Sequence, residues 1–459
     1  MAYLSGIKHR LFIREESTYG DLNNGGSNTL ASAQGWIAGL TCYTRPGAKI
    51  SVQNNPIVQA GMGQPSAVGR GRSSVAGSFS FYLPKADRLG STISQTQGFL
   101  LFFKHLYGDV TRHGTGTLDH IAKMPVGSST GDTDLEWKAH FSKFDTVKDH
   151  RNTTIGDFAH ANIDIKESFS FISFFSEGEA YLYTGVCPTS MSITASDANS
   201  LITADVSFIA RSVHKIWYDP TAGTNTGTFK PFKDEYISVS GNTGNIAADG
   251  DLITQAKTTF FTDTNSPLVS DTLAAIESEV SVDFNGSGTN PAAITTSDGS
   301  GFEVSGISIN ITKPLGHTNE FGGSSLDSAD RLDRRFNYTK PRLTGNKSLS
   351  GSFTMPIQKA VFTNFTSASV VKDYTEYFRR ASQGIENLED IALQITFSES
   401  ATSRADQYVF DFDNVVFGST DFANIDTGIS TTTVNWSAIQ AKSSGVDSDR
   451  FATLTYKMN

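Results

Sequence analysis

The sequence predicts an α+β protein, mainly β, built from two tandem domains that each combine a β-sandwich or barrel with one flanking α-helix. Its composition is rich in Phe (32) and Gly (41), and only 18% of the residues are charged. Short apolar runs such as ALQITF alternate with Gly- and Asn-rich breaks, which is typical of strands joined by turns. The strand VAGSFSFYLPK (75–85) returns 274 residues later as LSGSFTMPIQK (349–359), which indicates an internal repeat.

The segments before this strand also match in the two copies. IAGLTCYTRPG (37–47) matches VSGISINITKPLG (304–316), and each reads as a strand that a basic residue and a Pro bring to an end. A polar segment of about 28 residues then precedes each GSF strand. Because connections usually have 4–6 residues, we expect a long functional loop, about 45–74 in the first copy.

A helix is expected after each GSF strand. SQTQGFLLFFKHLYG (94–108) and VVKDYTEYFRRASQG (370–384) carry aromatic residues at helical spacing and end in Gly, the usual residue after a helix C-terminus. The aromatic stripes should pack on a sheet. They are Phe99, Phe102, Phe103 and Leu106 in the first helix, and Tyr374, Tyr377 and Phe378 in the second.

A matching strand closes each copy, ADVSFIA (204–210) in the first and TTVNWSA (432–438) in the second. These segments place the first domain at 1–215, a linker at 216–232 and the second domain at 233–459. Residues 301–459 form the core of the second repeat, whereas 233–300 read either as an insert or as its start. The first copy also carries a long excursion, about 109–165.

Charge and cysteine usage exclude several classes of protein. Residues 1–230 hold 20 Lys+Arg against 19 Asp+Glu, a charge of +1; residues 231–459 hold 17 against 28, a charge of −11. An acidic half argues against a nucleic-acid-binding face. The apolar run FLLFF is too short to cross a bilayer, and the N-terminus lacks the pattern of a signal peptide. Cys42 and Cys187 form no disulfide framework and read as core thiols of a protein made in a reducing cytoplasm.

No spacing of residues predicts a catalytic, cofactor or metal site. Six of the nine histidines fall between 105 and 160, but no HExxH or close ligand pair accompanies them, so solvated side chains are the simpler interpretation. These are His105, His113, His120, His140, His150 and His160. In GRGRSS (69–74), Arg70 and Arg72 are expected to pair with acidic groups of a neighbouring chain and not to form a phosphate loop.

Three further polar clusters have simple structural interpretations. The basic pairs of LDRRFNY (332–338) and YFRRAS (377–382) resemble stacking sites for nucleic acid, but two arginines in a turn are usually a surface ion pair. The carboxylates of DFDN (411–414) could form a glycosidase pair or a calcium corner. Strand alternation predicts instead that Asp411 and Asp413 face water while Phe410 and Phe412 face the core. We therefore expect no enzymatic activity.

The order of these segments resembles a known family. FIREESTYG (12–20) is similar to the N-terminal arm of the tail tube proteins (major tail proteins) of long-tailed bacteriophages. IAGLTCYTRPG, the long loop, VAGSFSFYLP and the helix ending in HLYG resemble the core of that fold, and MSITASDANSLITADVSFIAR (191–211) resembles its last strand pair. Two copies indicate the internally duplicated type. The second copy shows no clear equivalent of the FIREESTYG arm.

The resemblance implies a fold and an assembly. Six such domains close a ring, so three chains give a ring with pseudo-sixfold symmetry, and the long loops hold one ring to the next. Stacked rings form the hollow tail tube of the virion, through which viral DNA is ejected without specific binding, and an acidic lumen would repel its phosphates. Other partners would lie at the tube ends: the tape measure, terminator and baseplate or tip proteins. No cofactor or membrane is implied, and synthesis would take place in the host cytoplasm.

Three alternatives remain open at this level. The chain could be another virion or assembly β-protein. A carbohydrate-binding adhesive β-protein would share the Ser- and Thr-rich strands, but it should show a signal peptide and often clustered exposed Trp. A duplicated β-enzyme would need convergent histidines or carboxylates in both copies, whereas the histidines lie mostly in the first.

Overall fold

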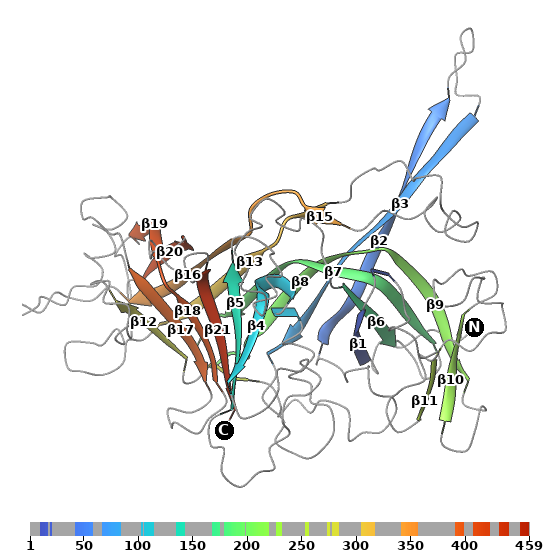
Figure 1. The fold of residues 1–459 in the computed structure, drawn as a ribbon. Coiled ribbons are helices and arrows are strands. Elements are labelled where there is room, and N and C mark those ends of the chain that lie inside the picture. The colour runs from blue at the N-terminus through green and yellow to red at the C-terminus, as the bar shows by residue number, and fades with distance from the viewer. Residues whose placement is uncertain are drawn as a thin grey trace, which may run out of the picture.

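The computed structural model shows a mainly β protein made of antiparallel sheets (Figure 1). It describes residues 10–16, 19–20, 42–57, 67–83, 102–103, 105–113, 135–142, 168–174, 179–197, 199–219, 226–231, 253–256, 273–275, 278–283, 304–316, 341–356, 391–398, 407–422, 431–439 and 450–458. These residues form two units of the same topology. Each unit packs an inner sheet of four strands against an outer sheet of six.

The first unit has the inner strand order β2-β3-β8-β7 and the outer order β1-β6-β7-β9-β10-β11. The long strand β7 belongs to both sheets, because its first half pairs with β6 and β9 and its second half pairs with β8. The strands are β1 (Arg10–Glu16), β2 (Cys42–Ile57), β3 (Ala67–Tyr82), β6 (Ser168–Phe174), β7 (Glu179–Ala195), β8 (Thr203–Ala210), β9 (Ser212–Asp219), β10 (Thr226–Pro231) and β11 (Ile253–Ala256).

The second unit repeats this plan with the inner order β13-β16-β20-β19 and the outer order β12-β17-β18-β21-β5-β4. Strands β18 and β19 together take the place of β7. The strands are β4 (Gly108–His113), β5 (Leu135–Ser142), β12 (Glu279–Asp283), β13 (Gly306–Thr312), β16 (Ser348–Pro356), β17 (Ala392–Ser398), β18 (Gln407–Phe412), β19 (Val415–Phe422), β20 (Thr431–Ala438) and β21 (Arg450–Met458). The short strands β14 (Leu315–Gly316) and β15 (Arg342–Leu343) pair separately.

Alternation of apolar and polar residues gives each inner strand one face toward the core and one polar face. In β8, Val206 and Phe208 are buried while Asp205 and Ser207 are exposed. The outer sheet meets the apolar face through aromatic rings: Phe79 of β3 and Phe171 of β6 lie edge to face with centroids 5.8 Å apart. In the second unit, Phe412 of β18 and Trp436 of β20 lie 4.4 Å apart, centroid to centroid, so both units have a two-layer core.

The repeated GSF strands occupy equivalent places in the two units. Gly77 of β3 lies opposite Phe208 of β8, and Gly351 of β16 lies opposite Trp436 of β20. A Cβ atom on Gly77 would lie 2.6 Å from the Phe208 ring, and one on Gly351 would lie 2.5 Å from the Trp436 ring. The carbonyl oxygens of Gly47 and Ser308 lie closer still, so the same crowding by a ring and a backbone carbonyl requires glycine in both copies. The predicted match of the GSF strands and of the closing strands is confirmed.

The long loop predicted at about 45–74 is wrong for most of its length. Residues 42–57 and 67–82 form β2 and β3, which pair with each other as one long antiparallel hairpin. In Figure 1 the outer part of this hairpin extends away from the two sheets. Its sequence, VQNNPI at 52–57 and AVGRGRSS at 67–74, lacks the regular apolar–polar alternation that marks a strand with one buried face.

Prolines do not end both matched strands as predicted. Pro314 does follow the end of β13 at Thr312. Pro46, however, lies inside β2, where the register shifts between Thr44 and Gly47. A proline is tolerated at such an irregularity because the ladder has no hydrogen bond to lose there.

The predicted linker at 216–232 belongs largely to the outer sheet of the first unit. Residues 216–219 end β9, and 226–231 form β10, which pairs with β9 and β11. In the segment 233–300, β12 pairs with β17 in the same way that β1 pairs with β6. Strand β12 is therefore the counterpart of the N-terminal segment that the sequence comparison of the two copies did not find.

Helix is scarce in the described part of the chain. Residues 102–103 and 105–107 are helical and are called the joint helix below; β4 begins at Gly108, as the terminal glycine predicts. Phe102, Phe103 and Leu106 have no exposed surface, so the predicted core stripe is confirmed for these three residues. Phe99 and the whole segment 370–384 lie outside the described residues.

A buried carboxylate anchors the N-terminal strand, which pairs with β6 and is not a free arm. Glu16, at the end of β1, is 4% exposed. It accepts hydrogen bonds from the amides of Gly20 (2.8 Å) and Gly185 (3.0 Å) and from the hydroxyls of Ser168 and Ser170. Burial raises the pKa of Glu16 from 4.5 to about 7, against the opposing effect of these hydrogen bonds.

We expect the stability of the protein to fall as the pH rises from about 4.5 to about 7. In this window the unfolded chain has lost the Glu16 proton while the folded chain still holds it, which costs up to about 3 kcal/mol of unfolding free energy. Denaturant unfolding at a series of pH values measures the slope. Glu16→Gln, which cannot ionise, should remove that part of the slope; an unchanged slope would contradict the assignment.

Candidate assembly interface

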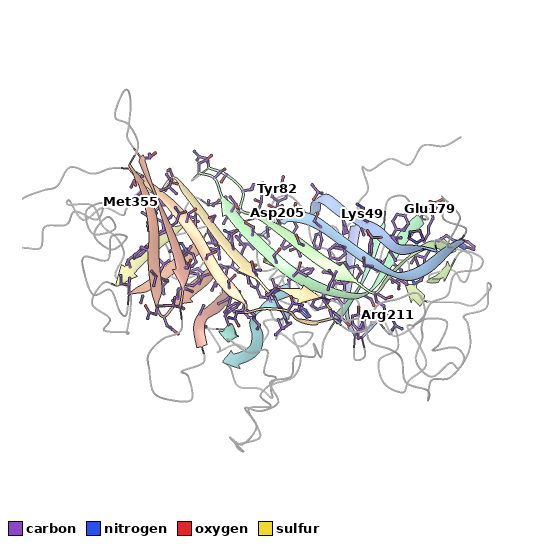
Figure 2. The ribbon with its side chains drawn as sticks, turned by 90° about the horizontal axis from the view of Figure 1, so that it is seen from above. Lys49, Tyr82, Glu179, Asp205, Arg211 and Met355 are labelled. Atoms are coloured by element: carbon purple, nitrogen blue, oxygen red, sulfur yellow. The ribbon has the colours of Figure 1, made fainter. Side chains whose placement is uncertain are left out.

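The two inner sheets join within the chain into one continuous sheet. Strand β7 of the first unit pairs antiparallel with β13 of the second, with Ile193 opposite Ile309 and Met191 opposite Ile311. The strand order is then β2-β3-β8-β7 followed by β13-β16-β20-β19, and Figure 2 shows this sheet running along the molecule. The contact is head to tail, because the β7 edge of one unit meets the first-strand edge of the next.

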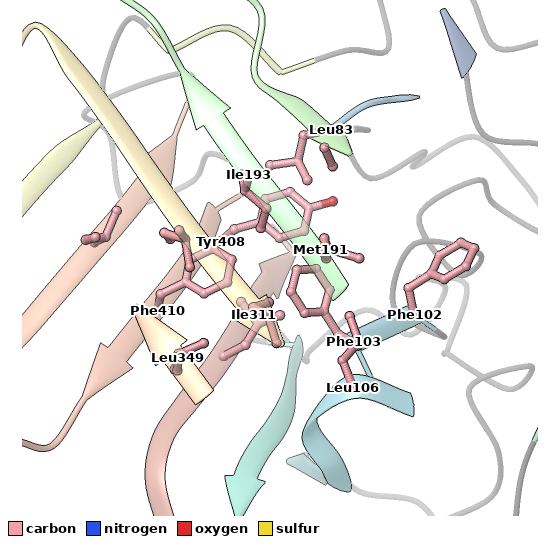
Figure 3. Close-up of a cluster of buried hydrophobic side chains, with 14 of the residues drawn as sticks. Leu83, Phe102, Phe103, Leu106, Met191, Ile193, Ile311, Leu349, Tyr408 and Phe410 are labelled. Carbon is pink, nitrogen blue, oxygen red and sulfur yellow. The ribbon is translucent and has the colours of Figure 1, made fainter. Parts of the chain in front are cut away.

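The joint helix is shared between the two units (Figure 3). Phe102 packs into the core of the first unit, with ring centroids 5.6 Å from Phe79 and 5.6 Å from Phe169. The next residue, Phe103, turns to the second unit and lies 5.7 Å from Phe410 of β18. One helix therefore covers the boundary between the two cores. This boundary, where β7 pairs with β13, is called the seam below.

Two buried lysines of the second unit bind the C-terminal end of this helix. Lys313, after β13, donates a hydrogen bond to the carbonyl of His105 at 2.7 Å, and Lys347, before β16, donates to the carbonyl of Tyr107 at 3.0 Å. Their exposed fractions are 1% and 5%. Carbonyls in the last turn of a helix have no helical partner and carry partial negative charge, so two ammonium groups are favourable there.

Replacing Lys347 by methionine should lower the free energy of unfolding by about 2 kcal/mol, because a buried hydrogen bond from a charged donor is lost. Thermal or denaturant unfolding measures the effect. Lys215→Met is the matched control, since Lys215 is 38% exposed and pairs with Glu179 at the surface, where an ion pair contributes little. Equal effects in the two variants would contradict a role for Lys347 in holding the units together.

A hairpin from the first half of the chain also crosses the seam. Strands β4 and β5, which follow the joint helix, pair with β21 and complete the outer sheet of the second unit. Residues 109–113 and 135–142 of the predicted excursion thus belong to the outer sheet of the second unit. In the first unit the same position, beside β9, is filled by β10 and β11.

The two ends of the continuous inner sheet are a β2 edge and a β19 edge. Among the strands that the structure describes, β2 pairs only with β3, and β19 pairs only with β20. Ile50 of β2 is 55% exposed, although it lies on the core side of its strand. An unpaired edge offers backbone donors and acceptors to another strand, and natural proteins either protect such edges or use them.

The face of the inner sheet that points away from the core is lined by hydroxyl and amide groups. Several of them join neighbouring strands: Ser192 donates to Asn310 at 2.7 Å, and the Ser308 and Ser352 hydroxyls lie 2.8 Å apart. On the described side chains of β13, β16 and β20 this face carries no carboxylate. Asp205 of β8 is exposed on the same face, and the expectation of an acidic lumen stays a prediction.

Several residues singled out in the sequence have structural roles. Cys187 is a buried thiol, as predicted. His105 is buried, with its ring 5.3 Å from Phe169, so its interpretation as a solvated side chain is wrong. Phe410 and Phe412 are buried and Asp413 is exposed, as strand alternation predicts, although β18 already ends at Phe412.

The remaining candidates are placed only in part. Arg70 and Arg72 lie in β3 and not in a glycine-rich loop; His113 and His140 lie in β4 and β5. The other three histidines and both basic pairs, 332–338 and 377–382, fall outside the described residues. Within the described ranges, no group of three or more His, Cys, Asp or Glu side chains could hold a metal ion. No helix in those ranges is long and apolar enough to cross a membrane.

Comparison with known proteins gives only distant structural likeness. No family model and no curated protein match the chain. Among solved structures, it is similar to a chain of the anti-feeding prophage baseplate (15% identity, TM-score 0.22), covering 35% of this chain and 86% of that one. A double mutant of Hcp1 from the E. coli EAEC 042 pathovar (11%, 0.19) covers 38% and 96%. The cap that terminates the anti-feeding prophage tube (12%, 0.19) covers 35% and 83%.

Proposed function

We propose that the protein is a structural subunit of a viral tail tube, in which three chains close a ring of six similar units and rings stack around a channel for DNA. The observation that carries this proposal is the head-to-tail repeat inside the chain. A β7 edge meets a β13 edge within the molecule, and the equivalent edges, β19 and β2, lie at the two ends of the same sheet.

Repeating the internal contact between chains extends the sheet with the same curvature at every seam. A heterologous contact of this kind gives a ring when its rotation closes and an open filament when it does not. The resemblance of FIREESTYG and the GSF strands to tail tube proteins supplies the closure at six units, hence three chains. Closing the ring would also pair both edges, which removes an aggregation hazard.

The polar face of the inner sheet suits the wall of a DNA channel. Its described side chains are mainly short hydroxyl and amide groups, many already bonded to one another across strands. Specific or tight binding of DNA needs clustered Lys and Arg that displace counterions from phosphates. The described side chains of this face include the charged groups of Lys49 and Asp205 but no cluster of Lys and Arg, so DNA would pass without being held.

Electron microscopy and native mass spectrometry of the purified protein test the proposal. We expect rings or tubes with threefold symmetry and rings that contain three copies of the chain. A protein that stays monomeric at every concentration, or a ring with six copies, would overturn it. The tube-end partners, the tape measure, terminator and baseplate or tip proteins, belong to the same proposal, as does a location in the virion after synthesis in the host cytoplasm.

The β2–β3 hairpin is proposed to hold one ring to the next. Because Ser51 lies opposite Ser74, residues 52–73 can be replaced by Asn-Gly, which makes a two-residue hairpin turn without disturbing the inner strands. This variant should form trimeric rings that no longer stack into tubes, as seen in negative-stain images. Tubes of normal length would show that the hairpin does not stack the rings.

A further inference from the structure

The contact between β7 and β13 within the chain offers a template for a contact between chains. We propose that β19 of one chain pairs antiparallel with β2 of the next, with Asp421 directly opposite Lys49. This inference rests on the proposed ring and adds the residues that decide which edges meet. It follows from three sets of strand registers, those at the internal seam, along β2 and along β19.

The internal seam provides the template. Strands β7 and β13 place Ile193 opposite Ile309 and Ser192 opposite Asn310. Ser192 donates a hydrogen bond to the Asn310 side-chain oxygen at 2.7 Å on the polar face of the sheet. The residue of β2 equivalent to Asn310 and the residue of β19 equivalent to Ser192 are therefore expected to lie opposite each other between chains.

The register along β2 is read from the repeated glycine. In the second unit, Gly351 lies opposite Ile309, so the next residue along β13 is Asn310. In the first unit, Gly77 lies opposite Ala48, so the next residue along β2 is Lys49. Lys49 therefore holds the place of Asn310, and its side chain is exposed.

The register along β19 is read from the closing strands. Asp205 of β8 lies opposite Ser192, and its counterpart on β20, Thr433, lies opposite Asp421. The two closing strands are aligned by Phe208 and Trp436, which face the repeated glycines. The equivalence is supported by a second feature, because β7 and β19 both shift register just before this point, between 188 and 190 and between 417 and 420.

Lys49 and Asp421 are thus the residues that the repeat places opposite each other at the seam between chains. Where the internal seam has a neutral hydrogen bond, this seam has opposite charges. Cross-strand pairs of opposite charge stabilise antiparallel sheets, and charge complementarity contributes more to the choice of partner than to affinity. A β2 edge that met another β2 edge would instead bring Lys49 toward a like charge.

The same register explains why Ile50 is exposed although it lies on the core side of β2. Ile50 takes the place of Ile311, since Val75 lies opposite Ile50 and Leu349 lies opposite Ile311. Ile311 is fully buried at the internal seam, whereas Ile50 is 55% exposed in the single chain. A second copy docked on β2 would cover Ile50 as the first unit covers Ile311.

Cysteine cross-linking of assembled protein tests the register. Lys49→Cys combined with Asp421→Cys should give disulfide-linked dimers and trimers on a non-reducing gel, because directly opposed residues lie within disulfide range. Ser51→Cys with Asp421→Cys is the matched control: it is one step away on the same face, at a spacing too wide for a disulfide. The single variants show any linkage that involves Cys42 or Cys187.

Charge reversal gives an independent measurement. Lys49→Asp alone and Asp421→Lys alone should each raise the concentration needed for ring formation about tenfold, and the double exchange should restore it. If rings form but only the Ser51 pair cross-links, or the double exchange restores nothing, the register is wrong and the ring proposal stands. If the unmodified chain forms no rings, the proposed function fails and this inference fails with it.

Discussion

Replacing Phe102 by alanine is expected to lower the free energy of unfolding by about 3–5 kcal/mol. Its ring is fully buried and lies within 6.1 Å, centroid to centroid, of four other rings: Phe79, Phe81, Phe169 and Phe171. Truncation leaves a cavity lined by rigid aromatic groups from both sheets, which cannot collapse to fill it. Denaturant unfolding measures the loss.

Tyr181→Ala is the matched control for Phe102, because Tyr181 is an aromatic residue of β7 that is 38% exposed. Its replacement should change the free energy of unfolding far less. A Phe102→Ala protein that melts at the wild-type temperature would mean that the joint helix does not seal the first core. The division of the helix between the two units would then be wrong as well.

Replacing Gly351 by alanine should lower the free energy of unfolding by about 3 kcal/mol or more. This loss is as large as that of a core truncation, but its cause is overcrowding and not a cavity. The added methyl group would overlap the carbonyl oxygen of Ser308 and approach the Trp436 ring to 2.5 Å. The aromatic ring could shift, but the carbonyl belongs to the backbone of β13 and cannot move without breaking the ladder. Thermal unfolding and the yield of soluble protein measure the effect.

Two other glycines sharpen this test. Gly77→Ala should be as harmful as Gly351→Ala, because the same overlap occurs with the Gly47 carbonyl and the Phe208 ring. Gly418→Ala should be nearly neutral, since its Cβ atom would lie 3.7 Å from the Asn435 carbonyl, an ordinary contact. Similar stabilities for the three variants would show that the repeat is a likeness of sequence without a shared packing requirement.

Features that depend on local pattern could be predicted from the sequence. The GSF strands, the closing strands and the aromatic stripe of the joint helix each carry a periodicity of buried residues that shows in the chain itself. Gly77 and Gly351 stood out because only glycine fits beneath the facing aromatic rings. The duplication was therefore visible, and with it the mainly β fold.

Sequence signals were weaker wherever strands pair away from the core. The sequence predicts loop and linker for the β2–β3 hairpin and the strands at 216–231, because an edge or protruding strand needs no apolar face. Their hydrogen bonds join backbone groups that every residue carries, so pairing leaves little trace in side-chain identity. The shifted register near Pro46 was hidden for the same reason.

By itself, the sequence determined that this protein is made of two similar β units with buried aromatic cores and no evident catalytic spacing. Only the tertiary structure decided how the units join: β7 beside β13, one helix shared by two cores, two lysines on its last carbonyls, and β4–β5 crossing to the outer sheet of the second unit. These contacts link residues far apart in the chain. No local pattern specifies such contacts, because their partners are set by which backbone edges and buried faces meet when the whole chain folds.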